Sequence, residues 1–218
     1  MVKHIKLDRA MMGLPFALIS AFVAGSGRPR GWILLCAVVA AVAAGAAAEA
    51  SHAYRRSLHG WGHWVLGLCL GLAPVGVWVA VRGGVEMAPV LLGGALLFWA
   101  AGFDLVAACK DIVGDREQGV FTVPARWGAR KAGVMSAGSH VVAFWLLAIF
   151  GEVAGLGWLY LSGVVLLVPV LYLLHRMAGP EDWSRGKGAS FVAADVLSMV
   201  LLLFAAADVI VLGGRMPI

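Results

Sequence analysis

Long apolar runs separated by short polar turns define the pattern of this chain. Seven runs can be marked, and each is near the length of about 20 residues that crosses the hydrocarbon core of a bilayer. The runs predict helices over residues 10–25, 31–50, 63–81, 87–112, 132–150, 155–177 and 189–212. Glycine and proline clusters between the runs predict the turns, and Pro15 predicts a kink in the first and shortest helix.

The composition narrows the class of protein. The chain is 61% hydrophobic and 13% charged, with a mean hydropathy of +0.90. A soluble domain does not need so much apolar surface, so we expect an all-α, polytopic transmembrane bundle of about seven helices, forming one domain over residues 1–218. Cys36, Cys69 and Cys109 each lie inside an apolar run, far apart, which predicts buried hydrophobic side chains rather than disulfides.

The basic residues predict how the protein is oriented in the membrane. A net charge of +5 is compatible with nucleic-acid binding, but the basic residues lie in short loops between apolar runs. If the N-terminus is cytoplasmic, thirteen Lys and Arg residues fall on the cytoplasmic side and four on the other. This excess follows the positive-inside rule. We therefore expect a protein of the inner membrane whose N-terminus and 112–131 loop face the cytoplasm.

Three acids at the end of the fourth run are the first candidates for chemistry. Asp104, Asp111 and Asp115 are spaced seven and then four residues apart. On a continuous α-helix these offsets return to one face, with Asp104 about 10 Å deeper along the axis than Asp111. Because charge inside a membrane span is costly, Asp104 is a candidate functional residue.

Asp111 and Asp115 suit a magnesium ion, which binds through one or two carboxylates together with substrate phosphates. Nearby basic residues are candidates for holding the rest of a diphosphate: Lys110, Arg116, Arg126, Arg130 and Lys131. The apolar bundle beneath them suits a lipid tail. A D-x-x-x-D pair also commonly caps a solvated helix end, and Lys110 is an alternative ion-pair partner for one acid.

Other polar residues lie in or near the apolar runs. Glu49 and Asp195 are candidates for the cavity, whereas Asp208 is expected at the far membrane interface. Five histidines share no ligand spacing, which favours loop or interfacial roles over metal binding: His52, His59, His63, His140 and His175.

Four stretches resemble the UbiA family of membrane prenyltransferases, in particular the branch that acts on 4-hydroxybenzoate in quinone synthesis. They are residues 6–18 (KLDRAMMGLPFAL), 67–78 (GLCLGLAPVGVW), 102–128, which contain Asp111-x-x-x-Asp115, and 182–198. The resemblance implies a bundle with a central cavity, Mg²⁺ as cofactor, and polyprenyl diphosphate and a small aromatic acceptor as substrates. It also implies that Asp104 lines the cavity and orients the acceptor.

The chain departs from the family pattern. Relatives resemble one another in having nine helices and two aspartate-rich motifs, and the first motif and about two helices have no counterpart here. Tyr54 and Arg56 resemble the family's Y-x-K/R substrate-binding pattern, and Glu49 is a candidate substitute for the missing acids. Ala107 stands where a tyrosine is usual, and Asp195 stands near a usual asparagine.

Two main functional hypotheses follow. The resemblance implies magnesium-dependent transfer of a polyprenyl group from its diphosphate to an aromatic ring, in ubiquinone or menaquinone synthesis. The alternative is a catalytically impaired relative that binds prenyl diphosphate or only packs with other membrane proteins. A small transporter ranks last, because the acids concentrate at one end of the predicted bundle.

Overall fold

The computed structural model describes residues 8–53, 60–177 and 187–212. Seven long helices match the seven predicted runs: α1 (Asp8–Ala24), α2 (Gly31–Ala53), α3 (Gly62–Arg82), α4 (Met87–Ala107), α7 (Ala129–Val153), α8 (Trp158–Met177) and α9 (Lys187–Leu212). Three short helices lie between α4 and α7: η1 (Ala108–Asp111), α5 (Ile112–Glu117) and α6 (Val123–Trp127). The described residues contain no strand, which confirms the all-α prediction.

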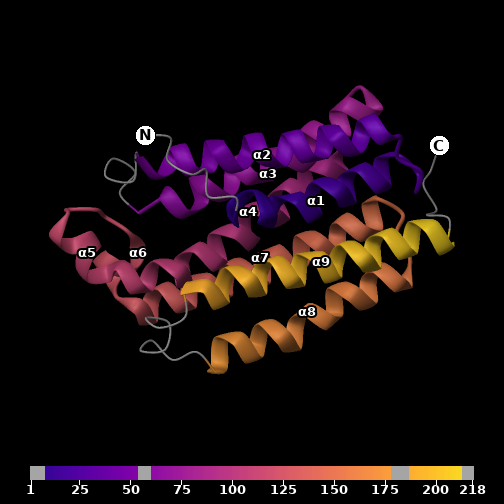
Figure 1. Ribbon diagram of the computed structural model, residues 1–218. Helices are drawn as coiled ribbons and strands as arrows, with labels where there is room; N and C mark the ends of the chain where they lie inside the picture. The colour runs from indigo at the N-terminus through magenta and orange to yellow at the C-terminus, as the bar shows by residue number, and fades with distance from the viewer. Residues whose placement is uncertain (1–7, 54–59, 178–186, 213–218) are drawn as a thin grey trace.

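The bundle has the dimensions of a membrane protein. Among the residues that the structure describes, six spans are long and apolar enough to cross a bilayer, and α1 contributes a shorter apolar segment, Met11–Ala24. The long helices lie lengthwise beside one another, and α5 and α6 sit together at one end (Figure 1). Because hydrocarbon offers no partner for backbone N–H and C=O groups, helices satisfy these groups internally. The chain is an integral membrane protein.

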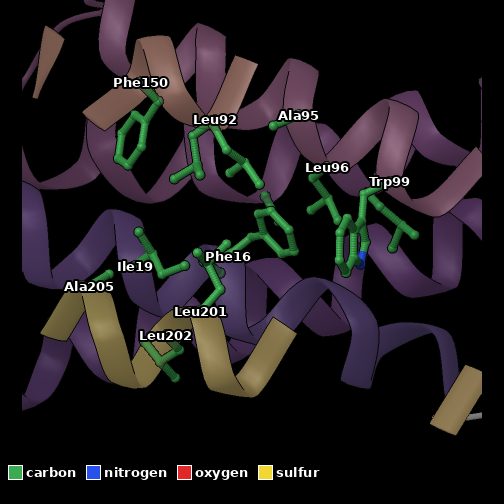
Figure 2. Close-up of a cluster of buried hydrophobic side chains, with 14 of the residues drawn as sticks. Phe16, Ile19, Leu92, Ala95, Leu96, Trp99, Phe150, Leu201, Leu202 and Ala205 are labelled. Atoms are coloured by element: carbon green, nitrogen blue, oxygen red, sulfur yellow. The ribbon is translucent and has the colours of Figure 1, made fainter. Parts of the chain in front are cut away.

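Helix α4 is the central element. The buried share of its span is 67%, against 28% to 44% for the other five. Its apolar side chains meet those of α1, α7 and α9 in one continuous core (Figure 2). The labelled core residues are Phe16, Ile19, Leu92, Ala95, Leu96, Trp99, Phe150, Leu201, Leu202 and Ala205. Since lipid tails are as apolar as leucine, close van der Waals packing stabilises this core more than exclusion of water does.

Glycines bring α3 and α4 into close contact. A Cβ atom on Gly67 would collide with the backbone carbonyl of Leu97, and one on Gly71 would collide with that of Gly93. Small residues of this kind allow two membrane helices to approach closely. The α3–α4 pair is therefore an antiparallel hairpin in which the depth of each residue is tightly set.

Asp208 has a different role from the interfacial one that we expected. It lies on α9, is 0% exposed, and accepts hydrogen bonds from the backbone N–H groups of Gly157 at 2.7 Å and Tyr160 at 3.1 Å. A carboxylate in this position satisfies N–H groups that have no partner within the helix. Asp208 thus caps the start of α8 from a neighbouring helix.

Candidate functional site

The predicted continuous helix through Asp104, Asp111 and Asp115 is interrupted. The α-helical part of α4 ends at Ala107, and a 3₁₀ turn, η1, connects it to α5. A 3₁₀ turn has three residues per turn rather than 3.6, so ideal α-helical spacing does not apply from Asp104 to Asp111. The continuous α-helix assumed for the three carboxylates is therefore wrong, and Asp104 and Asp115 contact different partners.

Asp104 pairs with a histidine that sequence reasoning did not select. Its Oδ2 atom lies 2.6 Å from Nδ1 of His63, the second residue of α3. The two residues are 3% and 1% exposed. Antiparallel helices joined by a short turn place residues equally distant from that turn at the same depth, and His63 and Asp104 are close to such a pair. The hairpin register was the signal in the sequence that could have found His63.

Asp115 is held to helix α6 through Thr122. The Thr122 hydroxyl donates to Oδ2 of Asp115 at 2.8 Å and accepts from the backbone N–H of Ala125 at 3.3 Å, as the N-cap of α6. The next residue, Arg116, donates from Nε to the carbonyl oxygen of Ala125 at 2.8 Å. Asp115 and Arg116 therefore fix the position of α6 in addition to any role with a ligand.

A small pocket joins the two hydrogen-bonded pairs. His63 and Thr122 line it together with Gly60, Gly62 and Phe121, and it leaves no space for a water molecule. Each of the two lining polar residues contacts one of the predicted acids, His63 contacting Asp104 and Thr122 contacting Asp115. The pocket thus connects the buried acid of α4 with the acid of α5, although the start of α3 lies far away in sequence.

The predicted basic residues belong to η1, α5, α6 and the start of α7. Helices α5 and α6 lie together at one end of the molecule (Figure 1). Lys110 is half-buried, whereas four others on α5, α6 and the start of α7 are exposed: Arg116, Arg126, Arg130 and Lys131. Asp111 is also exposed, and the Arg126 guanidinium lies 5.6 Å from the centre of the Trp127 ring. This end combines accessible carboxylate and guanidinium groups, which suits a ligand with phosphates and a divalent cation.

The remaining predicted site residues lie elsewhere or outside the described part. Asp195 is half-buried on α9. Tyr54 and Arg56 are outside the described residues, and so is the side chain of Glu49, although its backbone belongs to α2. Within residues 8–53, 60–177 and 187–212, no three His, Cys, Asp or Glu side chains form a group that could hold a metal ion.

A second polar cluster lies in the bundle interior beside α4. The Ser136 hydroxyl donates to the Gly102 carbonyl at 2.7 Å and lies 3.2 Å from Nε2 of His175. The buried ring of His140 meets the ring of His175 edge-on, at 5.1 Å between centroids, and is tilted against the ring of Phe103, at 4.5 Å. These contacts attach α7 and α8 to α4 next to Asp104, and spacing in the sequence gave no sign of them.

Comparison with known proteins identifies the fold and the family. The UbiA prenyltransferase family matches residues 54–194, which is more than half of the chain. The chain belongs to the UbiA prenyltransferase family. This match includes both residue pairs at the pocket and the exposed Asp111, so the candidate site lies inside the part that the family shares.

The chain is also similar to a known enzyme in sequence and to a solved structure in fold. A 4-hydroxybenzoate solanesyltransferase from Synechocystis sp. is 34% identical over 119 residues, which are 55% of this chain and 36% of that enzyme. The chain therefore matches only about a third of the length of that relative. The solved apo structure of a UbiA homolog from Aeropyrum pernix K1 has a TM-score of 0.70 at 21% identity, covering 97% of this chain and 99% of the other. At that identity the likeness shows a shared fold.

Proposed function

We propose that this UbiA-family protein transfers a polyprenyl group from its diphosphate to a small aromatic acceptor such as 4-hydroxybenzoate, with Mg²⁺ as cofactor, in quinone synthesis. The family and the similar solanesyltransferase support this proposal. The structural observation that carries it is that two hydrogen-bonded pairs lie beside each other at one end of the bundle, His63 with Asp104 and Thr122 with Asp115. Three segments distant in sequence supply polar groups there, beside the exposed basic residues.

The donor groups fit a magnesium ion. Asp111 is exposed, and Asp115 is half-buried with one oxygen bonded to Thr122. Carboxylate oxygens are hard donors, and magnesium needs only one or two of them when substrate phosphates and waters complete its shell. We propose that Asp111 and Asp115 hold the ion. When bound, it would neutralise charge on the diphosphate that departs.

The protein groups would bind and orient the two substrates. Arg116, Arg126 and Lys131 would contact the diphosphate, with Lys110 closer to the bundle. The prenyl chain would enter the apolar interior. During transfer the allylic C–O bond breaks, a ring carbon of the acceptor forms the new C–C bond, and the ring loses a proton. Asp104 would orient the acceptor, as the family resemblance implies, in a site poor in water.

We also propose that the acid-bearing end faces the cytoplasm of an inner membrane. The thirteen basic residues on that side, against four on the other, support this orientation. A water-soluble diphosphate headgroup and a small aromatic acid would then reach the site from the cytoplasm, while the prenyl chain reaches it from the bilayer.

The test is prenyl transfer by the purified protein in detergent or lipid. Radiolabelled geranyl diphosphate and 4-hydroxybenzoate would be supplied with and without Mg²⁺, and Asp111→Asn would be compared with Glu117→Gln. Glu117 is an exposed acid on α5 and serves as the matched control. We expect magnesium-dependent product that falls by about 10-fold to 100-fold in Asp111→Asn, by analogy with losses on altering metal-site groups, and stays unchanged in Glu117→Gln.

A negative result for prenyl transfer can be interpreted if a full-length relative is active in the same assay. Absence of product would then reject the proposed activity for this chain. Binding of the labelled diphosphate without product would favour the alternative of a non-catalytic binding protein. If Asp111→Asn and Glu117→Gln lower product formation equally, Asp111 does not belong to the proposed metal site.

A further inference from the structure

A cavity lies at the end of the bundle opposite to the candidate site. Its volume is about 260 Å³. It is lined by residues from the end of α3, the start of α4 and the end of α7: Trp78, Arg82, Glu86, Met87, Ala88, Val153 and Ala154. Along the axis of α4, this cavity and Ala107 lie about 30 Å apart. This distance equals the thickness of a typical hydrocarbon core. The cavity therefore lies at the membrane surface that the predicted acids do not face.

The cavity carries one positive and one negative side chain. Arg82 ends α3 and Glu86 precedes α4, so both are held by the short turn that begins at Gly83, whose φ of 81° suits glycine. A guanidinium binds phosphate oxygens in a planar, two-pronged geometry. Glu86 makes no side-chain hydrogen bond to cap α4, and its carboxylate is an acceptor for an ammonium group. One cation and one anion fit a zwitterionic ligand.

The remaining walls are apolar and extend toward lipid. Ala88 and Ala154 are buried, whereas Met87 is 63% exposed and Val153 is 43% exposed. Trp78 is 1% exposed, and its indole N–H has no acceptor among the described residues. A phosphate oxygen is the kind of acceptor that such a donor needs. The cavity thus offers polar groups for a headgroup and exposed apolar side chains for the chains attached to it.

We propose that this cavity binds the headgroup of a phosphatidylethanolamine-type phospholipid. The phosphate contacts Arg82 and the primary ammonium contacts Glu86, while the acyl chains lie over Met87 and Val153. Free phosphoethanolamine shares the polar chemistry but would leave the apolar walls without a partner. The quaternary ammonium of phosphatidylcholine has no N–H to donate to Glu86. The proposal is independent of prenyl transfer, because the cavity lies at the other end of the bundle.

The experiment is a lipid titration of the full chain in detergent, read by native mass spectrometry. The ligands are phosphatidylethanolamine, phosphatidylcholine, phosphatidylglycerol and soluble glycerophosphoethanolamine. The variants are Arg82→Gln and Glu86→Gln, and the control is Arg176→Gln, which removes an exposed charge from α8. All three positions are exposed, so we expect the helical circular dichroism and the melting temperature to be retained.

We expect phosphatidylethanolamine to bind more tightly than the other three ligands. Arg82→Gln should weaken its binding about tenfold, the effect of losing one charge-assisted hydrogen bond. Glu86→Gln should abolish the preference over phosphatidylcholine and phosphatidylglycerol, and Arg176→Gln should change neither. If Arg82→Gln and Arg176→Gln weaken the binding of phosphatidylethanolamine equally, the proposed site is wrong. If soluble glycerophosphoethanolamine binds as tightly as phosphatidylethanolamine, the cavity does not select a lipid.

Discussion

The His63–Asp104 pair gives the sharpest test of the structure, because both side chains are almost fully buried between α3 and α4. The perturbation is His63→Leu, which replaces the imidazole with an apolar group and removes it from the carboxylate. Removing one partner of a buried hydrogen-bonded pair leaves the other polar group without a partner, which typically costs about 1–3 kcal/mol. With an Nδ1–Oδ2 distance of 2.6 Å and exposures of 1% and 3%, we expect a loss near the upper value, about 3 kcal/mol.

Two further variants separate the pair from the packing around it. Asp104→Asn retains a hydrogen-bonding group opposite His63, so we expect a smaller loss, about 1 kcal/mol. The double variant His63→Leu with Asp104→Leu removes both polar groups, and such replacements are often close to neutral. A double-mutant cycle made of His63→Leu, Asp104→Leu and their combination should therefore show a favourable coupling of about 2 kcal/mol or more between residues 63 and 104.

The assay is reversible unfolding in mixed micelles, with the free energy of unfolding followed by helical circular dichroism. Glu117→Gln on the surface of α5 is the control, because it removes a charge that is exposed rather than buried. The reasoning fails if His63→Leu costs less than about 1 kcal/mol, the usual size of a neutral hydrogen bond between membrane helices. It also fails if the two single losses simply add in the double variant.

Three other changes test separate parts of the fold. Asp208→Ala should lower the free energy of unfolding by about 2 kcal/mol, because the start of α8 loses its capping carboxylate; a loss below about 0.5 kcal/mol in the same unfolding assay would contradict the cap. Gly71→Ala should destabilise by about 2 kcal/mol through collision with a carbonyl oxygen of α4, whereas Gly76→Ala, which faces open space, should not; equal melting temperatures would contradict the close contact. Thr122→Val should speed amide hydrogen exchange in α6 about fivefold, since loss of the N-cap and of the bond to Asp115 costs about 1 kcal/mol; unchanged exchange would show that Thr122 does not hold α6.

Part of the candidate site could be predicted from the sequence. Asp104 stood out because an acid in an apolar run needs a polar partner, and its burial confirms that it lies inside the bundle. Ligand spacing along the chain does not indicate His63, because its contact with Asp104 depends on the depth of the two residues across the α3–α4 hairpin. The roles of Asp111 and Asp115 toward magnesium stay predictions. Thr122 had no signal beyond its position before a proline-containing turn.

The sequence by itself determined the seven long helices. Hydrocarbon thickness sets the length of a span, and the backbone must satisfy its hydrogen bonds within each span, so apolar runs and glycine–proline turns suffice to locate them. The contacts between helices were decided only in the tertiary structure. In water, an apolar stripe reveals which face of a helix is buried, but in lipid both faces are apolar. On α9, Leu201 is 0% exposed and Leu203 is 64% exposed, although the residue type is the same. Rotation and depth of each helix, and with them the contacts of Asp104, Asp115 and Asp208, therefore depend on how the whole bundle packs.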